Sequence, residues 1–179
     1  MAGGGGHPGF DRTATLIAAA VNGAVFALTL ASVWLLFPEP APPDALGLTA
    51  RLDLAARLAI WPPLLILLMV VATAAGRVPT AAFDPLKGRE GRFYTVNQRV
   101  LANTVEQSAI FLPAMAAGAI LFDAAWLAAL PLATWFFALG RLAFWAGYLA
   151  HSYARSPGMV VTASANLILL AGLLTTVLG

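Results

Sequence analysis

Long apolar runs separated by short polar segments make up this chain from residue 13 onwards. A helix needs about 20 apolar residues to cross roughly 30 Å of bilayer hydrocarbon, and it satisfies its own backbone hydrogen bonds there. Five runs reach that length, at residues 13–37, 54–75, 98–122, 125–149 and 158–178. The pattern therefore predicts an all-α integral membrane protein, a single helical bundle in contact with membrane lipid.

Prolines and glycines mark where these helices are interrupted. Residues 1–12 contain four consecutive glycines and are predicted to form a disordered leader, because ordering them costs too much conformational entropy. Residues 38–43 are rich in proline and are predicted to form an extended connection outside the bilayer core. Pro62 and Pro63 are expected to kink the second span. Asn22, within the first span, is expected to hydrogen-bond a neighbouring helix.

Composition agrees with a membrane location and excludes several kinds of chemistry. Hydrophobic residues make up 60% of the chain and charged residues only 10%, whereas a soluble domain carries about 25% charged residues. The chain has no cysteine, which excludes disulfides, thiolate metal sites and a cysteine nucleophile. Its two histidines, His7 and His151, lie far apart in sequence, so no metal site is predicted. A dispersed net charge of +2 gives no reason to expect nucleic-acid binding.

The basic residues predict an orientation in the membrane. They gather between the second and third spans, in residues 76–97, and such clusters mark the cytoplasmic side. The N-terminus and residues 151–157 then also face the cytoplasm, and the tight turn at Asp123 faces outward. The alanine-rich composition favours a bacterial inner membrane. An ion cluster is expected at the outer interface, formed by Arg51, Asp53 and Arg57.

The third span carries a polar stripe. At 100° per residue, Arg99, Asn103 and Glu106 fall within roughly 60° of one another on a helix, so they point toward one neighbour or cavity. A carboxylate near the bilayer centre costs about 2.5 to 3.5 kcal/mol on insertion scales, which makes a paired or functional Glu106 the expectation.

A second stripe lies on the fourth span, where Arg141 and Tyr148 are seven residues apart and Arg155 follows as the helix leaves the membrane. The short turn between these spans predicts a helical hairpin, in which Glu106 and Arg141 could meet at one level. Such a pocket would present guanidinium groups to a carboxylate or phosphate. By residue type alone, a Glu–Arg pair that only locks helices together is an equally good interpretation.

Two spaced motifs carry a resemblance to a known family. One is Arg99, Asn103-x-x-Glu106 and Pro113; the other is Gly140-Arg141-x-x-Phe144-x-x-Gly147-Tyr148, followed by Arg155 and Pro157. In this pairing the chain resembles the MAPEG family, the membrane-associated proteins in eicosanoid and glutathione metabolism. The resemblance implies a four-helix transmembrane bundle at residues 51–179, preceded by an additional N-terminal transmembrane helix and proline-rich loop at residues 13–50. It also implies a homotrimer, with glutathione as co-substrate bound between neighbouring subunits near the cytoplasmic side.

The resemblance implies roles for particular residues. Arg155 is similar to the arginine that activates the glutathione thiol. The residues implied to bind glutathione or an anion are Arg99, Asn103, Glu106, Arg141, Tyr148 and, by a looser alignment, Arg77. The chain departs from the family pattern at Leu101 and Ala102, where members commonly carry His and Arg, and at Phe144, which has no polar group.

The function implied is that of a glutathione-dependent transferase or peroxidase acting on a small apolar electrophile, with a guanidinium stabilising the attacking thiolate. Two alternatives use the same residues. One is a non-catalytic bundle in which they hold helices or subunits together, and the other is a small carrier that binds lipid or an anion in the polar pocket.

Overall fold

The computed structural model describes residues 12–79, 90–151 and 153–179, and its regular elements there are all helical. The expected leader at residues 1–12 therefore lies almost wholly outside the described residues. Within these ranges, five helical spans are long and apolar enough to cross a membrane, which agrees with the predicted number. The elements are α1 (Arg12–Leu35), the short 3-10 helix η1 (Pro43–Leu46), α2 (Leu48–Leu58), α3 (Trp61–Ala75), α4 (Arg92–Leu121), α5 (Ala124–Ala150) and α6 (Ser156–Leu178).

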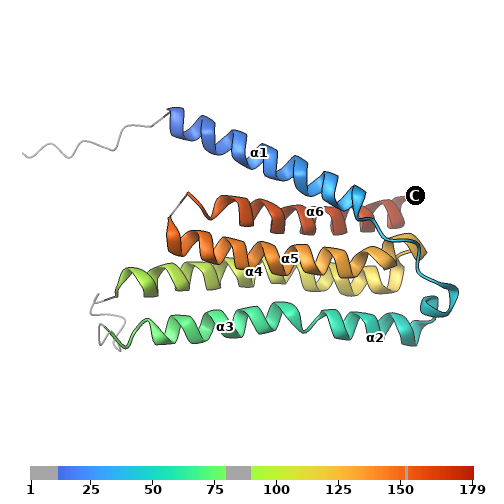
Figure 1. Ribbon diagram of the computed structural model, residues 1–179. Helices are drawn as coiled ribbons and strands as arrows, with labels where there is room; N and C mark the ends of the chain where they lie inside the picture. The colour runs from blue at the N-terminus through green and yellow to red at the C-terminus, as the bar shows by residue number, and fades with distance from the viewer. Residues whose placement is uncertain (1–11, 80–89, 152) are drawn as a thin grey trace, which may run out of the picture.

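The second span is a broken helix, as the prolines predicted. α2 ends at Leu58 and α3 begins at Trp61, and the two continue in nearly the same direction (Figure 1). Pro62 and Pro63 lack backbone N–H groups, and their rings would clash with carbonyls four residues earlier in a continuous helix. Both therefore lie in the first turn of a new helix, where a missing N–H leaves no bond unmade.

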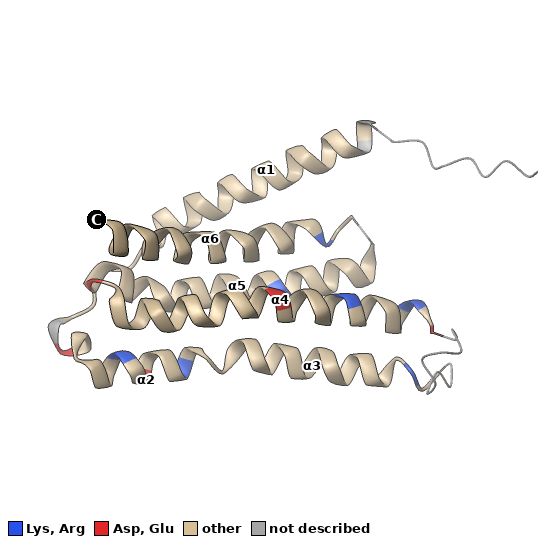
Figure 2. Ribbon diagram, turned by 180° about the vertical axis from the view of Figure 1, so that it is seen from behind, with Lys and Arg blue, Asp and Glu red and all other residues tan. Residues whose placement is uncertain are grey.

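The helix ends alternate between the two ends of the bundle. α1 and α4 begin, and α3 and α5 end, at the left of Figure 1, where α6 also begins. We call this end the site end and the opposite one the far end. Figure 2 shows charged residues to be sparse along the helices, with blue segments on α4, just after α3 and just before α6 toward the site end, and others on α2 at the far end.

α4 is longer than the sequence pattern predicted. It begins at Arg92, six residues before the expected start at Gln98, because its first two turns pack inside the protein: Tyr94 is 2% and Asn97 0% exposed. At 1.5 Å per residue its 30 residues span about 45 Å, so it extends beyond a hydrocarbon core of about 30 Å. Glu106 lies roughly 21 Å from the start of the helix, near its middle.

Helices α5 and α6 approach closely at glycines. A Cβ on Gly158 would overlap the backbone nitrogen of Phe144, and one on Gly140 would lie 2.6 Å from Oγ1 of Thr162. Because these two positions have no side chains, the backbones of α5 and α6 lie close together. Buried polar side chains of the two helices can then hydrogen-bond each other, as Arg141 and Thr162 do. The far half of the bundle is filled by large apolar side chains, including Phe111 of α4 stacked on Phe137 of α5 with ring centroids 4.3 Å apart.

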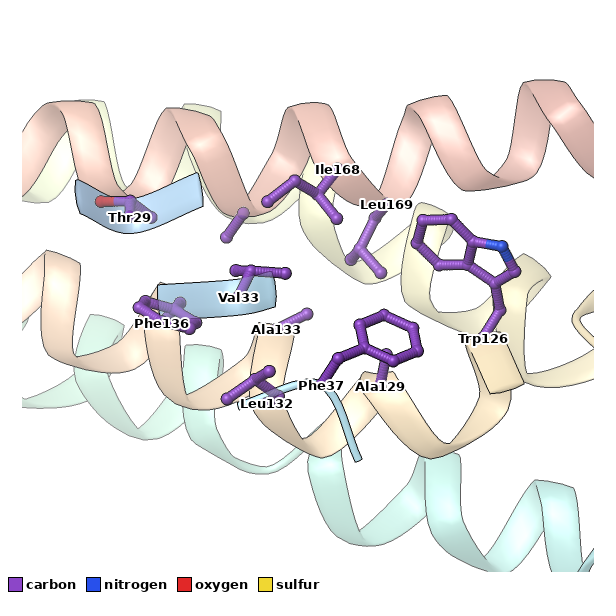
Figure 3. Close-up of a pocket in the computed structure, with 11 residues that line it drawn as sticks. Thr29, Val33, Phe37, Trp126, Ala129, Leu132, Ala133, Phe136, Ile168 and Leu169 are labelled. Carbon is purple, nitrogen blue, oxygen red and sulfur yellow. The ribbon is translucent and has the colours of Figure 1, made fainter. Parts of the chain in front are cut away.

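The first helix lies outside this core, against α6 (Figure 1). Most of its side chains are exposed, but its second half contacts the bundle: Val33 and the following Phe37 point toward α5 and α6, beside Trp126 and Leu169 (Figure 3). Near the site end, Asn22 accepts a hydrogen bond from the Ser156 hydroxyl at 2.6 Å. The expected interhelical hydrogen bond of Asn22 is thus confirmed.

The expected ion cluster at the far end is only partly correct. Arg57 and Asp53 form an exposed ion pair at 2.8 Å. Arg51 instead donates hydrogen bonds to the carbonyls of Ala119 and Phe122, at 3.0 and 2.8 Å, and so caps the last turn of α4. The last carbonyls of a helix have no partners within the helix and carry partial negative charge, which a guanidinium satisfies.

Arg51→Ala is expected to lower the free energy of unfolding in detergent by about 2 kcal/mol, because hydrogen bonds from a charged group to several carbonyls are lost. Arg57→Ala is the matched control, since it removes the same side chain from an exposed pair and should leave the melting temperature unchanged. Equal melting temperatures of the two variants would show that the Arg51 hydrogen bonds do not stabilise the end of α4.

Candidate functional site

A pocket of about 500 Å³ opens between α4, α5 and the start of α6, toward the site end. We call it the arginine pocket. It is lined by Arg99, Asn103, Phe144, Tyr148, Arg155, Ser156 and Met159. Four of the residues predicted to form the site, Arg99, Asn103, Tyr148 and Arg155, therefore lie around one cavity. They come from two helices and from the connection that joins α5 to α6.

Tyr148 links the two arginines of this pocket. Its hydroxyl oxygen accepts a hydrogen bond from Nη1 of Arg99 at 3.3 Å, and the Arg155 guanidinium lies over its ring, 4.4 Å from the centroid. The tyrosine is 6% exposed, whereas both arginines are exposed. Among the described residues, neither arginine has a carboxylate within salt-bridge distance. Two positive charges thus face the pocket and are available to an anion.

Arg141 is fully buried and stands behind the pocket rather than lining it. Its Nε donates to Oγ1 of Thr162 at 2.9 Å, and its Nη1 donates to Oδ1 of Asn103 at 2.7 Å. Its guanidinium also lies over the Phe144 ring, 4.5 Å from the centroid. A buried guanidinium is tolerated when its donors are satisfied, and this one holds the Asn103 amide in a fixed orientation.

Glu106 is joined to Arg141 only through Asn103. The Asn103 amide nitrogen donates to Oε2 of Glu106 at 3.3 Å, and the glutamate side chain is exposed. The expectation that Glu106 and Arg141 meet is therefore wrong: Asn103 lies between them and hydrogen-bonds both. Periodicity placed all three residues on facing stripes and could not decide which side chain reaches the arginine.

Arg77 lies apart from the arginine pocket in this chain. At the end of α3 it donates to the Tyr94 hydroxyl at 2.9 Å and lies over the same ring, 5.0 Å from its centroid. Arg77 and Tyr94 therefore lie at the site end, where α3 packs against α4.

Several residues of the site carry no signal in the motifs described above. Thr162 receives the Arg141 hydrogen bond, and Met159 and Ser156 line the pocket. Trp145 donates to Asn97 Oδ1 at 2.7 Å and so joins α5 to the extended start of α4. The two glycines at which α5 and α6 approach, Gly140 and Gly158, could have indicated Thr162. Thr162 follows Gly158 by one helical turn and so lies on the same face of α6.

Comparison with known proteins connects this arrangement to a family. The family model described as the MAPEG family matches residues 54–175, which includes most of the second span, all of α4 and α5 and most of α6, but not α1. No match was found among curated proteins. The match includes every residue of the arginine pocket, together with Arg141 and Glu106. The chain therefore belongs to the MAPEG family, the integral membrane proteins of eicosanoid and glutathione metabolism.

Proposed function

We propose that the protein is a glutathione-dependent membrane transferase or peroxidase that acts on a small apolar electrophile. The observation that carries the proposal is the arginine pocket, in which two exposed arginines and an oriented asparagine surround a cavity of about 500 Å³. Family membership makes glutathione the first ligand to consider.

The charges around the pocket suit glutathione as a substrate. The tripeptide carries two carboxylates and one ammonium group at neutral pH. Arg99 and Arg155 can each bind a carboxylate or thiolate through charge-assisted hydrogen bonds, and the exposed Glu106 carboxylate suits the ammonium group. Asn103, held by Arg141, offers its remaining amide capacity to the peptide backbone.

Arg155 is the residue we assign to thiol activation. A free thiol has a pKa of about 8.5, and a nearby guanidinium lowers this pKa by stabilising the thiolate. In conjugation, the thiolate sulfur forms a bond to an electrophilic carbon, the bond to the leaving group breaks, and the leaving group departs with the electron pair. The thiol proton passes to solvent. In peroxide reduction, two glutathione molecules supply the two electrons and form a disulfide, releasing an alcohol and water.

A homotrimer in a bacterial inner membrane, with the site end toward the cytoplasm, is part of the same proposal. The exposed Glu106 near the middle of α4 supports an assembly, because a carboxylate facing lipid is costly and a neighbouring subunit would cover it. Arg77 could then reach a pocket of the neighbouring copy. The described basic residues near the site end support the orientation: Arg77 follows α3, Arg92 and Arg99 lie in the first turns of α4, and Arg155 precedes α6. Lys87 and Arg89 lie outside the described residues.

The proposal is tested by conjugation of glutathione to a chloronitroaromatic compound, followed by absorbance with detergent-purified protein. The expected result is a product rate that saturates with both substrates and disappears when the protein is heat-denatured. A folded, monodisperse protein with no rate above the uncatalysed reaction would contradict catalysis and favour a non-catalytic bundle.

A further inference from the structure

A second cavity lies beside the arginine pocket, between α1 and the connection from α5 to α6. Its volume is about 470 Å³. We call it the α1 pocket. One wall is Ile17, Ala18 and Val21 of α1, and the other includes Tyr153, Ser156 and Pro157.

The two pockets share Ser156. This serine lines both cavities, and it directly follows Arg155, the residue assigned to thiol activation. Its hydroxyl donates to Asn22 of α1 at 2.6 Å, which fixes α1 to the wall between the pockets. A ligand in the α1 pocket and one in the arginine pocket would therefore both contact Ser156, one on each side of it.

The lining of the α1 pocket is apolar and aromatic. Ile17 and Val21 project from the same face of α1, one turn apart, and are 60% and 43% exposed. The Tyr153 ring stacks on the His151 ring with centroids 5.5 Å apart, which provides a flat aromatic surface at the pocket. Apolar side chains with a few polar groups at one edge are typical of sites for small apolar molecules.

We propose that the α1 pocket binds the apolar electrophile and that α1 is a substrate-binding helix of this protein. The inference rests on the proposed function for the identity of the second substrate. The family match begins at residue 54, so this wall lies outside the matched residues.

Filling the pocket tests the proposal kinetically. Val21→Trp is expected to raise the KM for the chloronitroaromatic compound at least about tenfold, the size of effect seen when an apolar pocket is altered. The KM for glutathione and the melting temperature should stay unchanged. Leu16→Trp is the matched control, because Leu16 lies on the same helix, is 70% exposed and does not line the pocket. Ile17→Phe provides a second, smaller obstruction if the tryptophan variant does not fold.

A second measurement is independent of glutathione. An alkyl benzophenone is photo-crosslinked to the purified protein without glutathione, and labelled peptides are identified by mass spectrometry. Labelling of residues 17–21 and of Tyr153, lost in Val21→Trp and retained in Leu16→Trp, is the expected result. Labelling elsewhere, or equal KM values for Val21→Trp and Leu16→Trp, would overturn the proposal. Labelling in the α1 pocket of a protein that binds no glutathione would overturn the proposed function but support the pocket as an apolar site.

Discussion

Arg155→Ala is expected to lower kcat for glutathione conjugation by about 10² to 10³ at neutral pH, which is the usual effect of removing one group that stabilises a reacting anion. Arg155 is exposed and contacts the Tyr148 ring from outside the core, so the variant should fold and melt like the wild type. Initial rates at saturating substrate concentrations measure the effect.

The pH profile distinguishes activation of the thiol from simple binding. Without Arg155, the pKa of bound glutathione should rise toward the free value of about 8.5, so the thiolate fraction falls most at low pH. The ratio of wild-type kcat to Arg155→Ala kcat is therefore expected to fall as pH rises. Arg155→Lys should retain part of the wild-type activity, because it keeps a positive charge. Arg92→Ala is the matched control, because Arg92 is an exposed arginine at the same end that lies outside the pocket. An unchanged kcat in Arg155→Ala would remove this residue from the mechanism.

The second large effect is expected at Arg141, as a positioning residue. Arg141→Met keeps an unbranched apolar stem but removes the guanidinium, which leaves Asn103 and Thr162 without their donor. Loss of these bonds should destabilise the bundle, and it should weaken glutathione binding about tenfold because the Asn103 amide is no longer held. Isothermal titration of the variant with glutathione measures the second effect directly.

A double-mutant cycle separates positioning from general destabilisation. If Arg141 acts through Asn103, then Arg141→Met should weaken glutathione binding much less in an Asn103→Ala background than in the wild type. Arg141→Lys supplies a folded alternative that keeps the charge. Additive losses in binding free energy would show that the two residues act independently.

Much of the fold followed from the sequence because membrane-spanning helices are specified locally. Run length gave the five spans, and Pro62 and Pro63 gave the break between α2 and α3. The early start of α4 was missed because Tyr94 and Asn97 are polar by type but are buried by their neighbours, Arg77 and Trp145. Periodicity within one helix contains no information on such contacts.

The sequence grouped residues better than it separated buried side chains from exposed ones. The two stripes predicted that their polar residues share one neighbourhood, and Arg99, Asn103, Tyr148 and Arg155 line one pocket. They did not distinguish the buried Arg141 from the exposed Arg155, because both occupy the same helical face by spacing. Burial of Arg141 depends on the close approach of α5 and α6 at Gly158, a contact between two helices that the periodicity of one helix does not describe.

Glutathione binding by isothermal titration calorimetry is the most direct test of the central claim. The wild-type protein in detergent is expected to show saturable binding with a Kd of about 1 mM or tighter, in the range of ordinary enzyme substrates. Arg99→Ala should weaken this binding about tenfold, because one charge-assisted contact is lost. A folded wild-type protein with no binding at about ten times that concentration would contradict the account and assign the arginine pocket a structural or lipid-binding role.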